Sequence, residues 1–221
     1  MRFRSWYVPL VIMLMACQFS DASEIIEPSD YHADEAKTKP GASWLALQPF
    51  KGGWRLVSAG PRFISIPDEI SGKGIRVKSG VKNTLVLLAD KSLSPGSVGK
   101  SLGGGSSGAS PEQKFESSRL PNIGEAKEFV LNGRRYTLSN SNGKLSLISQ
   151  GTSQPLFDYS EEFDNNATIV WIGDLDRDGR LDLIVDASDH YNVGELRLYL
   201  SGRARSGSLV KLVASRRTTG C

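Results

Sequence analysis

Several features are scarce in this sequence of 221 residues, and each scarcity excludes a class of protein. Two cysteines are too few for the disulfide scaffold of a small secreted domain, and a chain of this length can bury a core without one. With only two histidines, and His32 expected outside the folded domain, a serine hydrolase would have to use His190. Basic and acidic residues nearly balance, at 27 against 24, so the composition gives no sign of nucleic-acid binding.

The first residues have the pattern of a signal peptide. Arg2 and Arg4 precede an apolar run from Trp6 to Ala16, and this run is too short to span a bilayer. We therefore expect residues 1–16 to be removed from the mature protein.

The end of this run, Leu14-Met15-Ala16-Cys17, resembles the lipobox of bacterial lipoproteins. The resemblance implies that Cys17 is lipidated, becomes the mature N-terminus and anchors the protein to a membrane. Because Gln18 rather than aspartate follows, it also implies the outer membrane, with the protein facing the periplasm. The alternative is a soluble secreted or periplasmic protein cleaved after Ala22, because Ser20-Asp21-Ala22 also offers small residues near a cut.

Between this leader and Trp44 the chain is acidic and polar, with few large apolar groups to bury. We expect residues 17–43 to form a lipidated N-terminus and a flexible tether, with the folded domain spanning residues 44–221. Acylation of Cys17 would leave Cys221 as a lone thiol, which we expect to be a small buried side chain. A bridge between the two cysteines is possible only if the lipobox interpretation is wrong.

Residues 44–221 are predicted to be all-β, because the chain has 23 glycines and 10 prolines and its apolar stretches are short. Asn132-Gly133 and Asn142-Gly143 supply the positive φ angles of tight hairpin turns, so they predict a three-stranded meander. The expected architecture is mostly antiparallel hairpins and meanders, sandwich-like or like part of a propeller, with little helix. Stretches of strand length lie at residues 44–47, 54–57, 63–66, 75–77, 84–88, 129–131, 136–138, 145–148, 168–172, 181–185, 196–200 and 209–213.

Residues 94–110 differ in composition, because glycine and serine dominate and apolar side chains are almost absent. This composition is typical of a flexible surface loop or linker. Beyond it, Ser110-Pro111-Glu112 could open one short helix.

One segment between two apolar runs carries the strongest chemical motif of the sequence. Its predicted metal ligands are carboxylates at alternate positions, a closing carboxylate at position nine and one backbone carbonyl: Asp174, Asp176, Asp178, Asp182 and the carbonyl oxygen of Arg180. Gly179 permits the sharp turn that lets these oxygens converge. Ca²⁺ takes roughly six to eight oxygen ligands in a flexible shell, so the loop suits Ca²⁺ better than Mg²⁺ or zinc.

The charges of this loop support the same prediction. Two like charges about 4 Å apart repel by about 4 kcal/mol at an effective dielectric constant near 20, so four clustered aspartates would force the loop open without a cation. We expect the ion to be a staple that stabilises the fold, with the side chains of Arg177 and Arg180 pointing outward. The alternative is a solvated acidic turn that holds no metal.

The stretch from Ile169 to Val185, with Leu196-Arg-Leu-Tyr-Leu200 after it, resembles the FG-GAP and VCBS repeats of integrin-type β-propellers. The resemblance covers about residues 168–202 and implies a calcium-binding loop between two strands of one blade. The loop is not an EF-hand, because its position twelve is Val185 and both flanks are strand-like. A propeller needs several blades and the sequence holds one copy, so a complete propeller is not expected.

These features favour a non-enzymatic cell-envelope lipoprotein that acts in binding or assembly, with an envelope protein or a glycan as its partner. One alternative is a hydrolase of cell-wall or glycan material that uses His190, or two of the acids Asp158, Glu161, Glu162 and Asp164. Another is a calcium-dependent adhesion module, which would need a partly exposed ion beside a binding surface.

Overall fold

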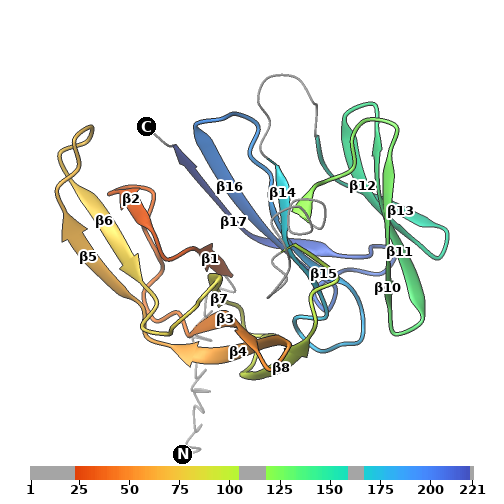
Figure 1. Ribbon diagram of the computed structural model, residues 1–221, viewed down its shortest axis with the longest axis horizontal. Coiled ribbons are helices and arrows are strands. Elements are labelled where there is room, and N and C mark those ends of the chain that lie inside the picture. Colours follow the sequence, from red (N-terminus) through yellow and green to blue (C-terminus); the bar gives the residue numbers. More distant parts are fainter. Residues whose placement is uncertain (1–22, 105–117, 159–166, 220–221) are drawn as a thin grey trace, which may run out of the picture.

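The computed structural model describes residues 23–104, 118–158 and 167–219 (Figure 1). Several predictions fall outside these residues: the signal peptide, the lipobox with Cys17, the short helix at 110–112, and the side chains of Glu161, Glu162, Asp164 and Cys221. The described residues confirm the all-β prediction, because they form four antiparallel sheets.

Two sheets are built from the N-terminal half of the chain. The outer N-terminal sheet has the order β2-β6-β5, and its strands are β2 (Asp30–His32), β5 (Arg62–Ile66) and β6 (Gly74–Lys78). The inner N-terminal sheet has the order β1-β7-β3-β4-β8, and its strands are β1 (Glu24–Ile26), β3 (Trp44–Phe50), β4 (Gly53–Ala59), β7 (Val86–Ala89) and β8 (Gly96–Gly99).

The other two sheets come almost entirely from the C-terminal half. The inner C-terminal sheet has the order β17-β16-β15-β14-β9, and its strands are β9 (Gly103–Gly104), β14 (Thr168–Gly173), β15 (Asp182–Asp186), β16 (Val193–Leu200) and β17 (Lys211–Thr219). The outer C-terminal sheet is a meander of β10 (Ala126–Leu131), β11 (Arg134–Ser141), β12 (Lys144–Ser149) and β13 (Thr152–Asp158).

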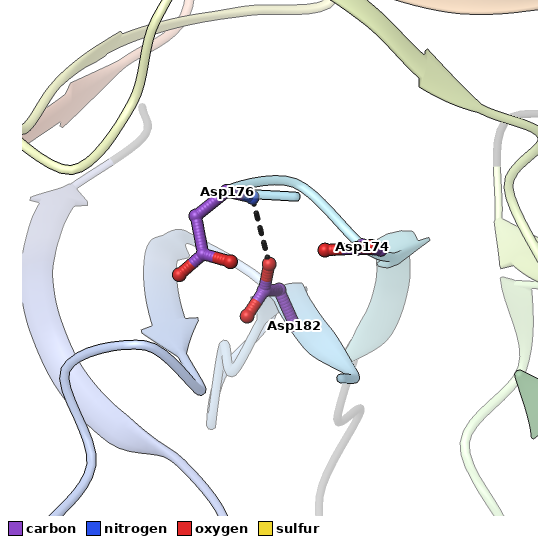
Figure 2. Close-up of side chains that lie close together, drawn as sticks. All are labelled: Asp174, Asp176 and Asp182. Atoms are coloured by element: carbon purple, nitrogen blue, oxygen red, sulfur yellow. Dashed lines mark hydrogen bonds between the residues drawn. The ribbon is translucent and has the colours of Figure 1, made fainter. Parts of the chain in front are cut away.

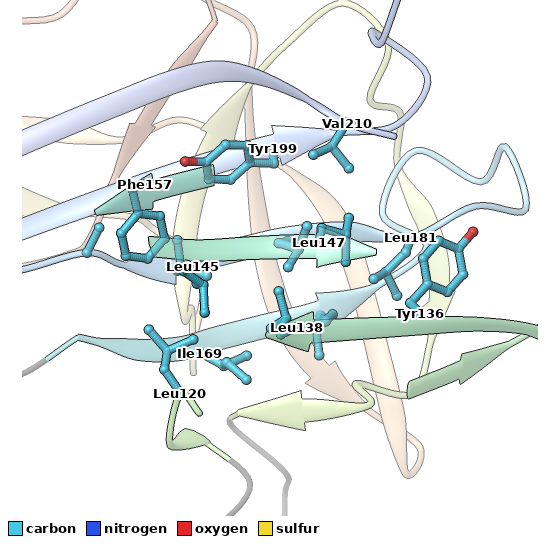
Figure 3. Packing of buried hydrophobic residues seen from close by; sticks show 14 of the residues in the cluster. Leu120, Tyr136, Leu138, Leu145, Leu147, Phe157, Ile169, Leu181, Tyr199 and Val210 are labelled. Carbon is cyan, nitrogen blue, oxygen red and sulfur yellow. The ribbon is translucent and has the colours of Figure 1, made fainter. Parts of the chain in front are cut away.

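Three hydrophobic clusters pack these sheets in series, from β5 and β6 at the left of Figure 1 to β12 and β13 at the right. One cluster joins the two N-terminal sheets, the second joins the two inner sheets, and the third joins the two C-terminal sheets. Figure 3 shows the third cluster, where Leu145 and Leu147 of β12 lie among side chains of the inner sheet such as Ile169. Each inner sheet is therefore covered on both faces.

This double burial explains the continuous apolar runs of the inner sheets. In β3, Leu45 and Leu47 pack toward the inner C-terminal sheet, whereas Trp44 and Ala46 pack toward the outer N-terminal sheet. In β15, Ile184 belongs to the cluster between the inner sheets, and its two neighbours belong to the cluster on the opposite face. The outer strands β11 and β12 instead bury every second residue, as expected for a sheet with one face exposed to solvent.

The turns of the outer C-terminal sheet confirm the predicted meander. Asn132-Gly133 has φ angles of 50° and 76°, and Asn142-Gly143 has φ angles of 51° and 73°. Both residues of each turn have a left-handed backbone conformation, as the tightest hairpins require. The sheet also has a fourth strand, β13, which follows a turn of the same kind at Gln150-Gly151. The sequence prediction missed this turn because glutamine is not a typical left-handed turn residue.

The prediction of a flexible tether over residues 17–43 is wrong from Ser23 onward. Strand β1 pairs with β7, and its residues Ile25 and Ile26 are buried in the clusters on the two faces of the inner N-terminal sheet. Strand β2 pairs with β6. The acidic, polar composition of this segment was misleading. Two isoleucines are enough to bury a strand of three residues, because adjacent side chains point to opposite faces of the sheet.

The prediction of a flexible loop or linker over residues 94–110 is wrong for residues 96–99 and 103–104. Strand β8 pairs with β4 and places Val98 in the cluster between the inner sheets, and β9 pairs with β14. Residues 105–110 lie outside the described residues. One valine among glycines and serines is too weak a signal to predict a strand from composition. The backbone hydrogen bonds that hold the two short strands do not depend on residue type, so they leave no compositional signal.

Candidate metal centre

The acidic loop joins β14 to β15 at one end of the inner C-terminal sheet, and Figure 2 shows three of its side chains. The loop curls because two residues have left-handed backbones, Arg177 with φ 64° and Gly179 with φ 82°. Strand β14 ends at Gly173 and β15 begins at Asp182, so both ends of the loop are fixed by the sheet. The predicted hairpin is therefore present at the predicted place.

The structure brings together three of the predicted ligands, Asp174, Asp176 and Asp182 (Figure 2). One carboxylate oxygen from each lies within 4.8 Å of the others. Carboxylates at this spacing share one centre, and hard cations such as Ca²⁺ prefer oxygen ligands of this kind. The cluster could therefore hold a metal ion.

Asp182 is the most deeply buried member of the cluster, with no exposed surface. Its Oδ2 accepts hydrogen bonds from the backbone nitrogens of Leu175 at 2.6 Å and Asp176 at 3.1 Å. Its Oδ1 accepts from the backbone nitrogen and the hydroxyl of Ser201, at 2.7 and 2.8 Å. Burial, followed by the nearby Asp176 carboxylate, raises the pKa of Asp182 to about 7.

Asp174 contains an oxygen atom without a hydrogen-bond partner. Its Oδ2 accepts from the backbone nitrogen of Gly179 at 3.0 Å, whereas Oδ1 is buried and accepts no hydrogen bond from any described residue. Buried polar atoms are rarely left in this state, so the free oxygen fits a missing ligand. Burial, with a further contribution from the Asp178 carboxylate, raises the pKa of Asp174.

Asp176 is partly buried, like Asp174, and accepts two backbone hydrogen bonds. Its Oδ1 accepts from the backbone nitrogen of Asp178 at 3.2 Å, and its Oδ2 accepts from that of Gly202 at 3.1 Å. Burial and then the Asp178 carboxylate raise its pKa. All three acids of the cluster thus have raised pKa values, the direction expected where negative charge is buried without a cation.

The fourth predicted carboxylate, Asp178, is engaged by Arg180. The Arg180 guanidinium lies 2.7 Å from Asp178 Oδ2 and also donates to the Ser201 carbonyl at 2.9 Å. The prediction that Arg180 points outward is therefore wrong, because this side chain folds back onto the loop. The carbonyl oxygen of Arg180 and the carboxylate of Asp178 stay predicted ligands.

The sequence prediction missed two residues that shape the site, Ser201 and Gly202, in the turn after β16. Ser201 is fully buried, and its hydroxyl lies 3.0 Å from Asp178 Oδ1 and 2.8 Å from Asp182 Oδ1. A Cβ at Gly202 would overlap the Asp176 carboxylate, so any larger residue there would displace this ligand. A Ser-Gly pair after an apolar strand looks like an ordinary turn, so only the fold reveals its contact with the acidic loop.

Among the described residues, the other candidates do not form a comparable centre. The Nδ1 atom of His190 lies 2.6 Å from Asn192 Oδ1, and its ring lies 4.5 Å from that of Tyr191. A cavity of about 300 Å³ nearby is lined by Tyr191 and Asn192 together with several acids, but not by His190. Asp158 is the exposed last residue of β13.

Comparisons of this chain with known protein families, with curated proteins and with solved structures gave no match. No helix within the described ranges has the length and apolar character needed to cross a bilayer.

Proposed function

We propose that this protein is a non-enzymatic, lipid-anchored protein of the bacterial cell envelope, acting in binding or assembly, whose sheets are stabilised by one calcium ion. The observation that carries the calcium proposal is the meeting of the carboxylates of Asp174, Asp176 and Asp182, where Asp174 also has a buried oxygen with no hydrogen-bond partner among the described residues. A divalent cation held by the three carboxylates would neutralise their charge, and Asp174 Oδ1 is an oxygen that no described donor occupies.

Calcium suits the donor set better than other common ions. The available ligands are carboxylate oxygens with additional oxygens from the predicted ligands Asp178 and Arg180, and no described histidine or cysteine belongs to the cluster. Zinc favours nitrogen and sulfur ligands, and Mg²⁺ demands a more regular octahedron with several waters.

The anchor proposal rests on the lipobox at residues 14–17 and gains a geometric consequence from the fold. Ser23, the first described residue, donates a hydrogen bond to Asp90 and lies six residues after Cys17 in the sequence. Six extended residues span at most about 20 Å. A lipid on Cys17 would therefore hold the sheets close to the membrane surface.

Thermal unfolding in calcium, magnesium and a chelator tests the calcium proposal. Ligand bound only by the folded state stabilises it by about 2.7 kcal/mol at a concentration of 100 Kd, so chelation should lower Tm by roughly 5 to 10 °C. Magnesium should restore much less of the loss than calcium. An unchanged Tm after chelation would remove the calcium proposal.

Metabolic labelling with a fatty acid tests the anchor separately. The natural chain should incorporate label and fractionate with membranes, and the Cys17→Ala variant should do neither. The Cys221→Ala variant is the matched control and should be labelled normally. Label retained in the Cys17→Ala variant would refute the lipobox interpretation.

A calcium-dependent adhesion module is a second candidate, favoured by the partial exposure of Asp174 and Asp176. An ion held there could still accept an oxygen from a partner molecule. Calcium-dependent binding of the purified protein to envelope glycans, lost in the Asp176→Asn variant, would support this candidate. Binding that persists in chelator would exclude it.

A further inference from the structure

The acidic loop lies where two core clusters end. Leu175, inside the loop, is fully buried in the cluster between the two inner sheets. Leu181, at the end of the loop, is fully buried in the cluster between the two C-terminal sheets. The conformation of one short loop therefore places an apolar side chain in each of two different sheet interfaces.

Arg177 connects the loop to the inner N-terminal sheet. Its Nη2 donates to the Ser94 carbonyl at 2.8 Å, and its Nη1 donates to the Pro95 carbonyl at 3.2 Å. These residues lead directly into β8. A Cβ at Gly96 would overlap the Arg177 guanidinium, so the glycine makes room for this contact.

Asn132 connects the loop to the outer C-terminal sheet. It lies in the turn between β10 and β11, and its Nδ2 donates to the Gly179 carbonyl at 3.2 Å. Gly179 is also the residue whose backbone nitrogen binds Asp174 Oδ2. The turn of the outer sheet therefore contacts the part of the loop that shapes the cluster.

Within its own sheet the loop contacts the turn after β16. Gly202 donates its backbone N–H to Asp176, and Ser201 donates to Asp182. Together with the contacts of Arg177 and Asn132, these bonds connect the loop to three of the four sheets. Repulsion among uncompensated carboxylates would strain all of these contacts at once.

We propose that metal binding in the acidic loop fixes the packing of both neighbouring sheets, and that Arg177 and Asn132 are the positioning residues that carry the effect. This inference rests on the proposed metal site, whose independent support is the unpartnered Asp174 Oδ1. An ion that holds Asp174, Asp176 and Asp182 together keeps Leu175 and Leu181 in their clusters. Loss of the ion loosens the start of β8 and the β10–β11 turn together with the loop.

Hydrogen–deuterium exchange of the full chain in calcium and in chelator tests this inference. Chelation should raise deuterium uptake several-fold in peptides covering residues 174–182, and also in those covering 94–99 and 130–135. Peptides from β5 and β6 in the outer N-terminal sheet should change least and serve as the internal reference. Calcium binding is measured on the same samples by titration calorimetry.

Two variants separate the contribution of the Arg177 contact from that of the Asn132 contact. Arg177→Asn tolerates the left-handed backbone but is too short to reach Pro95, and Asn132→Gly keeps the turn while removing the amide. Both should still bind one calcium ion. Arg177→Asn should make residues 94–99 insensitive to calcium, and Asn132→Gly should do the same for residues 130–135.

The outcomes distinguish this inference from the metal site itself. Calcium that binds and protects residues 174–182 alone would overturn the coupling and leave the metal site intact. Both remote segments responding normally in the two variants would overturn the roles of Arg177 and Asn132. An absence of calcium binding in the natural chain would overturn the metal site, and the coupling with it.

Discussion

Two acidic stretches of this protein, residues 24–35 and residues 174–182, look alike in composition but have opposite electrostatic environments. In the first, the acids meet cations and donors from distant parts of the chain: Glu24 lies 3.1 Å from Arg216, and Asp30 lies 2.6 Å from Arg76. In the second, the acids meet one another, and the one arginine that folds back reaches only Asp178.

The pKa directions of the paired acid Asp30 and of the clustered acids record the same difference, although burial and then the Asp186 carboxylate raise the pKa of Glu27 in the first stretch. The hydrogen bond from Arg76 lowers the pKa of Asp30, whereas burial raises the pKa values of Asp174, Asp176 and Asp182. The number of acids in a stretch therefore does not tell whether they need a metal. What decides is whether the fold brings a positive partner to them.

Arg216 of β17 is the main partner of the first stretch. Its guanidinium donates to the carbonyls of Ile25 at 2.7 Å and Lys37 at 3.2 Å, to the carbonyl of Glu35, and to the Glu24 carboxylate. The side chains of Arg216 and Glu24 are only 11% and 8% exposed. One buried cation thus fastens the N-terminal segment to the last strand.

Removing this cation should give the largest effect. Breaking a buried ion pair from one side costs about 3 to 5 kcal/mol, so Arg216→Ala should lower the free energy of unfolding by about that amount in urea titrations. Arg217→Ala is the matched control, because the Arg217 side chain is half-exposed, at 49%, so its pairs with Asp189 and Glu195 should contribute about 0 to 1 kcal/mol. Equal losses in the two variants would contradict the role of Arg216 as a buried partner.

Neutralising the second stretch should have a smaller effect, and its sign should depend on calcium. Asp174→Asn with Asp176→Asn should cost about 2 to 3 kcal/mol in saturating calcium, because the stabilisation by the ion is lost. In chelator the same variant should be as stable as the natural chain or more stable, because repulsion is relieved. A similar loss in both conditions would contradict the need for a cation.

A pH series in chelator should sharpen the contrast further. The folded pKa of Asp182, about 7, lies above its unfolded value, so the stability from its protonated form is complete below about pH 4 and is lost as pH rises through 7. The expected loss of unfolding free energy is on the order of 1 kcal/mol, because neighbouring acids share the proton. Circular dichroism melts between pH 5 and 9 measure it.

Saturating calcium should abolish this dependence, because the ion binds the deprotonated carboxylate. The Asp182→Asn variant, which has no carboxyl to titrate at this position, should show a weaker pH dependence in chelator, because only Asp174 and Asp176 of the cluster can still titrate. Stability in chelator that increases between pH 5 and 8 in the natural chain would contradict the assigned environment of Asp182.

The smallest effect is expected at the exposed pair of the first stretch. Asp30 and Arg76 are each about half exposed, at 50% and 48%, so solvent screens their interaction. Asp30→Asn should leave the urea midpoint within experimental error, with or without calcium. A calcium-dependent change in this variant would show that the ion binds elsewhere.

The fold was predictable where local rules decide it. The Asn-Gly turns and the continuous apolar runs identified the meander and the inner strands, because turn chemistry and double burial leave a local pattern. Strands β1 and β8 were not predictable, because each depends on pairing with distant strands and on one or two buried side chains.

The candidate site was predictable to a similar extent. The spacing of Asp174, Asp176 and Asp182 identified the residues that meet, because one loop supplies them all. The contributions of Ser201 and Gly202 were hidden, because they come from a turn that reaches the loop only through the sheet. The orientation of the Arg180 side chain toward Asp178 was also not predictable. The alternation of acidic and other residues along a loop does not fix the direction of a long side chain.

Titration calorimetry with calcium tests the central claim most directly, that Asp174, Asp176 and Asp182 need a cation because the fold brings no positive side chain to these three acids. The natural chain should bind one calcium ion, and the Asp174→Asn, Asp176→Asn double variant should bind none, while Asp30→Asn binds as the natural chain does. No binding by the natural chain, or undiminished binding by the double variant, would contradict the claim.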